Sequence, residues 1–172
     1  MMKKCRALSI PATEVFLVVN IPSQEMALKT KEVPTQLFPV STSIKPPSCT
    51  EDSLGTPWGL HRVEQKIGGG QPQGMVFRGR VPTGKCFQDC DEATNHENLI
   101  TTRILRIRGL EEGVNTGGNR DSWNRYIYIH GTNHEDKIGS PASSGCIQLT
   151  NTDMLTVYNQ VPEGSLLLIE CN

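Results

Sequence analysis

The chain has 172 residues, which is enough for one domain with a sizeable core but short for two. Its 17 Lys and Arg nearly balance 18 Asp and Glu, so the composition argues against a basic nucleic-acid interface or a polybasic membrane patch. With 16 Gly and 11 Pro, and without long helical periodicity, the composition favours short strands joined by turns.

The first residues, 1–13, are expected to form a tail or a short edge element ahead of a folded domain over residues 14–172. The N-terminus is basic, as in a signal peptide, but Pro11 and Glu14 interrupt the apolar run and no A-x-A-like cleavage site follows. We therefore expect neither a clear signal peptide nor a transmembrane segment.

Alternating and β-branched residues predict most of the fold. Strands are expected at 14–20, 25–30, 60–67, 75–82, 99–110 and 125–131, and a last one after the turn at 162–164. Pro34 and Pro39 favour an edge or irregular position for the extended piece 33–43. A helix is expected from about 152 to 160, capped at 150–151, and the polar residues 84–98 are expected to be an exposed insertion. The prediction is a single mainly-β domain, a β-sandwich or partly closed barrel with one short helix.

Six cysteines are present, and two of them form a C-x3-C pair, Cys86 and Cys90. His96 lies near this pair, but no second pair completes a zinc site. A local disulfide and two free thiols are the other interpretations.

One His and one Cys lie at the two ends of a glycine-punctuated loop. His130 ends a predicted strand, and Cys146 closes the loop. A thiolate is a nucleophile, and a histidine beside it can act as its base while the Gly131 carbonyl orients the ring. The small residues 143–145 allow backbone N–H groups to converge on an oxyanion. The chemistry expected is acyl transfer or hydrolysis at a carbonyl; the alternative is a buried, inert cysteine and a structural histidine.

These residues resemble the catalytic motif of the L,D-transpeptidases, the YkuD-type domain. The resemblance rests on H-G-T at 130–132, S-x-G-C-I at 143–147 and L-x-N-x-D at 149–153. A G-T-P-x-G segment at 55–59 and a V-P-x-G-x-x-L-x-I ending at 161–169 agree with it, so that it covers about residues 14–170.

The resemblance implies a cysteine-dependent acyltransferase acting on peptidoglycan stem peptides. Cys146 would attack the carbonyl between an L-centre and a D-centre, the terminal D-residue would leave, and a thioester would pass to an amine. It assigns His130 as base, the Gly131 carbonyl as its orienter, and Ser144 and Gly145 to the oxyanion turn. No metal or organic cofactor is needed, carbapenems are candidate inhibitors, and the location implied is the cell envelope, periplasm or exterior.

One position departs from the family pattern: Gln148 stands where an arginine is usual. Arg holds a carboxylate bidentately, whereas Gln is neutral, so the departure bears on substrate recognition. Arg125 or Lys137 could supply a replacement cation.

The candidate substrate-binding residues share positions in or beside the motif. They are Ser143, Gln148, Trp123, Arg125, Tyr126 and Thr132. Two other functions stay open: a catalytically impaired module that binds cell-wall peptide, and a thiol L,D-carboxypeptidase or hydrolase.

Overall fold

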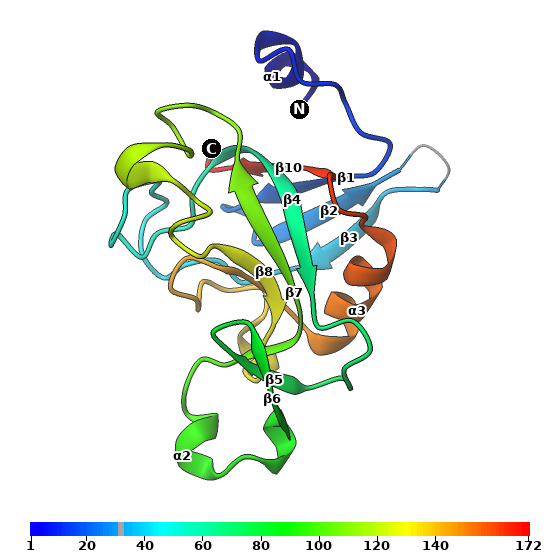
Figure 1. Ribbon diagram of the computed structural model, residues 1–172, viewed down its shortest axis with the longest axis vertical. Coiled ribbons are helices and arrows are strands. Elements are labelled where there is room, and N and C mark those ends of the chain that lie inside the picture. Colours follow the sequence, from blue (N-terminus) through cyan, green and yellow to red (C-terminus); the bar gives the residue numbers. More distant parts are fainter. Residues whose placement is uncertain (31–32) are drawn as a thin grey trace.

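The computed structural model describes residues 1–30 and 33–172. These residues form a ten-stranded sheet in the order β3-β2-β1-β10-β4-β7-β5-β6, and β8 lies between β7 and β9. The sheet curls into a partly closed barrel with one short helix, α3, packed against it (Figure 1), which confirms the predicted mainly-β class.

The elements have these bounds. The strands are β1 (Phe16–Asn20), β2 (Glu25–Lys29), β3 (Gln36–Pro39), β4 (Gly59–Ile67), β5 (Met75–Arg78), β6 (Val81–Cys86), β7 (Ile100–Gly109), β8 (Tyr128–Gly131), β9 (Ile147–Leu149) and β10 (Leu166–Glu170). The helices are α1 (Met2–Ala7), α2 (Glu92–Asn95) and α3 (Asn151–Gln160).

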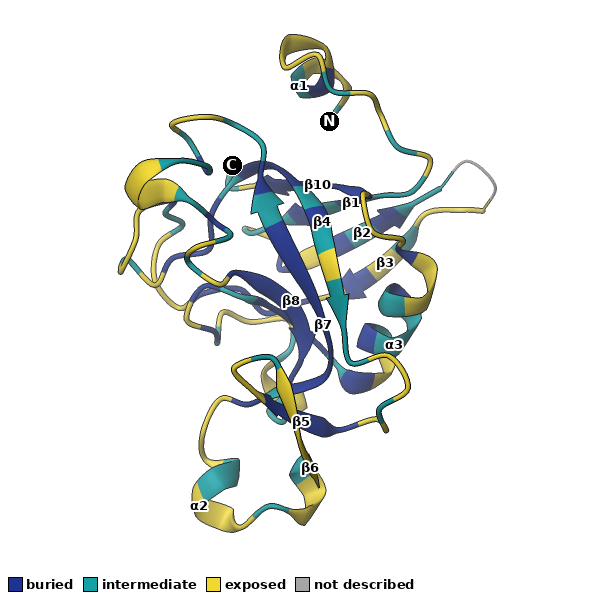
Figure 2. Ribbon diagram, in the orientation of Figure 1, coloured by how far each residue is buried: buried dark blue, intermediate teal, exposed yellow. Residues whose placement is uncertain are grey.

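The core lies on the concave side of the sheet, where β7 and β8 are almost wholly buried (Figure 2). Because side chains alternate along a strand, Leu105 and Ile107 of β7 point into the core. Met154 and Val157 of α3 close it from the other side, and both are fully buried. Burial of each such side chain stabilises the fold by about 1.5–3 kcal/mol.

Helix α3 begins where the sequence predicts. The Thr150 side chain accepts a hydrogen bond from the Asp153 backbone N–H at 3.1 Å and donates to its carboxylate at 2.8 Å. This cap satisfies one of the N–H groups that the first helical turn leaves without partners. It ties the start of α3 to the end of β9, three residues after Cys146.

The segment expected as one strand at 75–82 is a hairpin instead, so that prediction is wrong. Gly79 and Arg80 form its two-residue turn, with φ of 56° and 71°. Left-handed backbone at both positions is what a tight hairpin turn requires. With α2, this hairpin makes a projection from the sheet, the lower part of Figure 1.

The N-terminal residues contain the short helix α1, a feature that the expected tail or edge element did not include. Cys5 of α1 is buried against Leu60 and Leu166 on the outer side of the sheet. Edge position is confirmed for β3, the strand that contains Pro39.

Two further features concern chemistry outside the predicted site. Cys86 and Cys90 are free thiols, and the Cys90 thiol lies 3.5 Å from the Cys86 carbonyl oxygen. Among residues 1–30 and 33–172, no helix is long and apolar enough to cross a membrane.

Candidate active site

The sheet brings His130 and Cys146 to one face through the parallel pairing of β8 and β9. His130 pairs with Gln148, and Ile129 pairs with Ile147. Residues paired in register project to the same face, as do residues two apart on one strand. Cys146, two residues before Gln148, therefore lies diagonally across from His130.

The orientation of the His130 ring is set by its neighbour. Its Nδ1 lies 2.7 Å from the Gly131 carbonyl oxygen. Because a carbonyl only accepts, Nδ1 carries the proton and Nε2 carries the lone pair. Burial lowers the pKa of His130 from 6.5 to about 4, so the ring is neutral at pH 7.

The Cys146 thiol is held at the start of β9. The Tyr128 N–H donates to Sγ at 3.4 Å, and the thiol donates to the Tyr126 carbonyl at 3.6 Å. Burial raises the pKa of Cys146 to about 11, against smaller opposing effects of the Tyr128 N–H and Arg125. The resting pair is therefore a neutral thiol and a neutral imidazole, and within the described residues no hydrogen bond joins them.

The turn before Cys146 requires a glycine. Gly145 has φ of 124°, and a Cβ there would lie 3.3 Å from Ile127. Its N–H donates to Ser143 Oγ at 3.2 Å, while Ser144 next to it is exposed. In the predicted oxyanion turn, Ser144 is thus exposed, Gly145 is buried, and the Gly145 N–H is engaged with Ser143.

Three of the predicted substrate-binding side chains lie in the interior. Ser143 is 1% exposed and donates to the Cys146 carbonyl; Thr132 is fully buried and accepts from the His134 N–H. Gln148 is 2% exposed, and its amide donates to Asn98 at 2.6 Å. All three side chains are therefore hydrogen-bonded to other residues of the protein.

Arg125, proposed from sequence as a replacement cation, is bound to the backbone. Its guanidinium donates to the Ser48 carbonyl at 3.0 Å and to the Gly55 carbonyl at 2.8 Å. These bonds fasten the 48–55 loop to the chain that leads into β8. Lys137, the other candidate, is exposed in the turn Glu135–Lys137.

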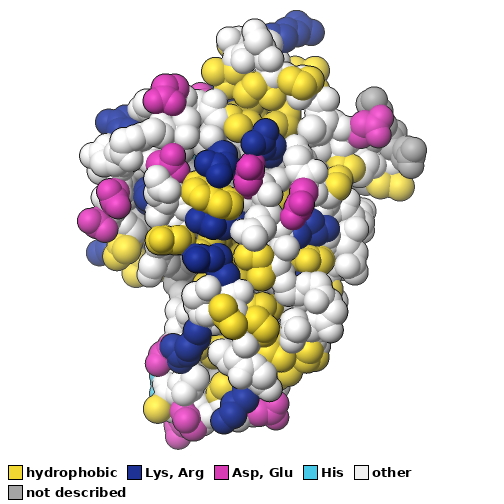
Figure 3. Space-filling model, viewed as in Figure 1, with side chains coloured by type: hydrophobic (Ala, Val, Ile, Leu, Met, Phe, Trp, Pro, Cys, Tyr) yellow, Lys and Arg dark blue, Asp and Glu magenta, His cyan; other side chains and the backbone are white. Residues whose placement is uncertain are grey.

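Tyr126 contacts the thiol through its carbonyl, and both Tyr126 and Trp123 lie against arginines that the sequence did not single out. Arg106 stacks on Trp123, and Arg80 lies over the Tyr126 ring. Basic and hydrophobic side chains are interleaved over the middle of this face in Figure 3. The alternation of β7 indicates which residues share a face with Arg106. The pairing of Arg106 with Tyr128 depends on the register between β7 and β8, which the sequence leaves open.

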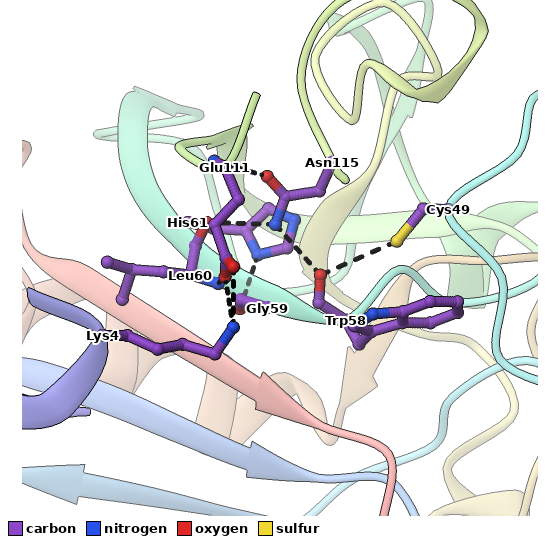
Figure 4. Close-up of polar contacts among 8 residues, drawn as sticks. All are labelled: Lys4, Cys49, Trp58, Gly59, Leu60, His61, Glu111 and Asn115. Atoms are coloured by element: carbon purple, nitrogen blue, oxygen red, sulfur yellow. Dashed lines mark hydrogen bonds and ion pairs between the residues drawn. The ribbon is translucent and has the colours of Figure 1, made fainter. Parts of the chain in front are cut away.

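A polar cluster around the buried residues His61 and Asn115 (Figure 4) is hydrogen-bonded to Ser122, the residue before Trp123. His61 Nε2 lies 3.0 Å from Ser122 Oγ, and burial lowers the pKa of His61 to about 4. The Asn115 amide donates to the Trp58 and Leu60 carbonyls, and Glu111 binds Lys4 at 2.7 Å. The cluster therefore joins α1 and β4 to the loop above the site.

Comparisons with known proteins agree with the motif and the geometry. The family model of the L,D-transpeptidase catalytic domain, YkuD, matches residues 14–169. YqjB of Bacillus subtilis (strain 168), which has a provisional L,D-transpeptidase name, is 39% identical over 45 residues, 26% of each chain. The chain thus matches about a quarter of that curated relative.

Solved structures share the fold. An L,D-transpeptidase from Mycobacterium smegmatis has a TM-score of 0.53 and 17% identity, over 91% of this chain and 58% of that one. L,D-transpeptidase 3 from Mycobacterium tuberculosis, solved with a faropenem-derived adduct, has a TM-score of 0.54 and 18% identity, over 91% of this chain and 60% of that one. The chain spans less than two thirds of these structures, and the match covers nearly all of its own length: it belongs to the L,D-transpeptidase catalytic domain family.

Proposed function

We propose that the chain is a cysteine L,D-transpeptidase that acts on peptidoglycan stem peptides in the cell envelope. The observation that carries this proposal is the arrangement of His130 and Cys146 on one face of paired strands, with the Gly131 carbonyl 2.7 Å from Nδ1. That arrangement leaves the basic nitrogen Nε2 available to a thiol.

The first half of the reaction forms an acyl-enzyme. The Cys146 thiol turns from the Tyr126 carbonyl toward His130, and Nε2 takes its proton as Sγ attacks the carbonyl between the L-centre and the D-centre. The N–H groups of Gly145 and Cys146 stabilise the oxyanion, Gly145 sharing the bond it now makes to Ser143. The C–N bond breaks, the imidazolium returns the proton to the leaving amine, and a thioester remains.

The second half reverses these roles. An amine of a neighbouring stem attacks the thioester, His130 takes its proton, and Cys146 leaves and is reprotonated. The product is a new amide, which is a crosslink when the amine belongs to a stem peptide. Proton transfer by a positioned base of this kind contributes about 10²–10⁴-fold to the rate.

The raised pKa of Cys146 and the lowered pKa of His130 favour proton transfer that is coupled to substrate binding. A neutral thiol with a pKa of about 11 is a weak nucleophile at pH 7, so the free enzyme reacts slowly with small electrophiles in solution. The proton moves once the substrate carbonyl is in place to accept attack.

Incubation with a disaccharide-tetrapeptide donor and an amine acceptor tests the proposal. We expect release of the terminal D-residue and a joined product, both lost in Cys146→Ala. Release without a joined product would make the protein a carboxypeptidase. Binding of the peptide without release by the wild type would make it a binding module.

A further inference from the structure

A pair of arginines lies on the reactive face of the sheet, next to Cys146. Arg106 of β7 pairs with Tyr128 of β8, and the Tyr128 N–H donates to Cys146 Sγ. One row across three strands thus carries Arg106, Tyr128 and Cys146. Neighbouring strands are about 4.8 Å apart, so Arg106 and Cys146 flank Tyr128 at about one strand spacing on either side.

Arg106 is a nearly buried cation that has no acidic partner within residues 1–30 and 33–172. It is 9% exposed, its guanidinium carbon is 3.3 Å from the Trp123 ring centroid, and it donates to the Trp123 carbonyl. Its Nε is buried and has no hydrogen-bond partner among the described residues. Burial and the cations Arg80 and Arg108 lower the pKa of Arg106. A buried charge with an unpaired donor destabilises the fold, so the retention of Arg106 at this position calls for a functional reason.

Arg80 reaches the same place at the expense of backbone strain. It occupies the hairpin turn with φ of 71°, a conformation that favours Gly or Asn. From there, Nη1 donates to the Tyr128 hydroxyl at 3.0 Å, and the guanidinium lies 5.1 Å from the Tyr126 ring centroid. The fold does not require arginine in this turn, whereas strain at a functional position is common.

A cleft of about 220 Å³ next to Tyr126 is less basic than the arginine pair. Glu51, Asp52 and Arg125 are among its lining residues. The Arg125 guanidinium already donates to the Ser48 and Gly55 carbonyls. A carboxylate is therefore favoured beside Arg80 and Arg106 over this cleft.

We propose that Arg80 and Arg106 bind the free carboxylate of the terminal D-residue, the residue that leaves when Cys146 is acylated. The inference rests on the proposed function and adds to it the two side chains that select a donor peptide with a free terminal carboxylate. Two guanidinium groups beside aromatic rings hold a carboxylate with several charge-assisted hydrogen bonds. A stem that continues beyond this residue has an amide in place of the carboxylate and is bound less well.

The test compares a tetrapeptide donor with the same peptide amidated at its C-terminus. The wild type is expected to release the D-residue from the free acid with a kcat/KM about tenfold higher than from the amide. Arg106→Gln and Arg80→Gly are expected to lose this preference, through a higher KM for the acid and an unchanged KM for the amide. Arg80→Gly relaxes the strained turn, so its melting temperature should not fall.

Arg78→Gln is the matched control. Arg78 lies on the same hairpin, is exposed and pairs with Glu97 at 3.0 Å. This variant should keep the wild-type preference for the acid. Equal losses of kcat/KM for the acid and the amide in the Arg80 and Arg106 variants, or an unchanged preference for the acid, would overturn the proposal.

Calorimetry on Cys146→Ala separates this inference from the reaction itself. The acid should bind about tenfold more tightly than the amide, and adding Arg106→Gln should abolish the difference. If Cys146→Ala binds the acid selectively but the wild type shows no turnover, the arginine site is supported and the transpeptidase function is contradicted. If the wild type turns over the donor but acid and amide bind equally, the transpeptidase function is supported and the arginine site is contradicted.

Discussion

Gly131 holds the His130 ring through its carbonyl oxygen, 2.7 Å from Nδ1, and has no room for a side chain of its own. A Cβ at Gly131 would lie 2.7 Å from Asn151 Oδ1 and 2.9 Å from the Thr101 carbonyl. The orientation of the base therefore depends on close packing between β8, β7 and the first residue of α3.

Gly131→Ala is expected to impair both stability and activity. Overpacking at a site this tight costs about 1–3 kcal/mol, and any shift of β8 moves the carbonyl that orients His130. Urea unfolding and kcat for the donor peptide measure the two effects. Gly69→Ala, where a Cβ would lie 3.3 Å from the Tyr158 hydroxyl, is the control and should change neither. A fully active, stable Gly131→Ala would show that the carbonyl position is not needed.

The ionisation of the site predicts that the resting thiol is protonated at pH 7. The Cys146 pKa is about 11 and the His130 pKa is about 4, so a neutral pair predominates between these values. The thiolate ultraviolet absorption, taken as wild type minus Cys146→Ala, should be absent at pH 7 and emerge only toward about pH 11. A thiolate signal already present below pH 7 would mean an ion pair, contrary to this account.

Fold stability should decrease as the pH falls from 6.5 toward about 4. His61 and His130 both have folded-state pKa values of about 4, below the ordinary 6.5, so the unfolded chain binds protons first. Each histidine then contributes up to about 3 kcal/mol that is present above pH 6.5 and lost across this range.

Unfolding free energies at about pH 7 and about pH 4 measure this effect. His61→Gln should reduce the difference between the two by about half, whereas His96→Gln, at a largely exposed side chain, should not change it. The same pH dependence in wild type and His61→Gln would contradict a buried neutral His61.

Local signals predicted some parts of this molecule well, and non-local pairing explains the rest. The cap at Thr150 and the chain from β9 into α3 are contained within a few residues, so the sequence predicted them. The turn at Gly79 and Arg80 departs from the predicted single strand because Arg is rare in left-handed backbone, so the local sequence does not indicate a turn there.

The site residues also fall into those that local sequence predicts and those that non-local pairing places. His130 and Cys146 are marked by their glycine-rich motif, whereas the partner of Arg106 is set by the register between β7 and β8. Register depends on long-range burial that no local pattern specifies. Arg125 could not be assigned for the same reason: its carbonyl partners at 48 and 55 are about seventy residues away in the chain.

Arg125→Ala is expected to act mainly through stability. The side chain donates to the Ser48 and Gly55 carbonyls, and loss of charge-assisted bonds of this kind costs about 1.5–3 kcal/mol. Urea unfolding should show this loss, with Lys137→Ala as the exposed control. Unchanged stability with a higher KM for the donor would instead make Arg125 a substrate cation, as its sequence position first suggested.

The central claim is that Cys146, activated by His130, forms an acyl-enzyme. Intact-protein mass spectrometry after incubation with a carbapenem tests it most directly, because the other five cysteines serve as internal controls. We predict one covalent adduct, mapped to Cys146, absent in Cys146→Ala and much slower to form in His130→Ala. Absence of an adduct in the folded wild type, or an adduct that persists in Cys146→Ala, would contradict the account.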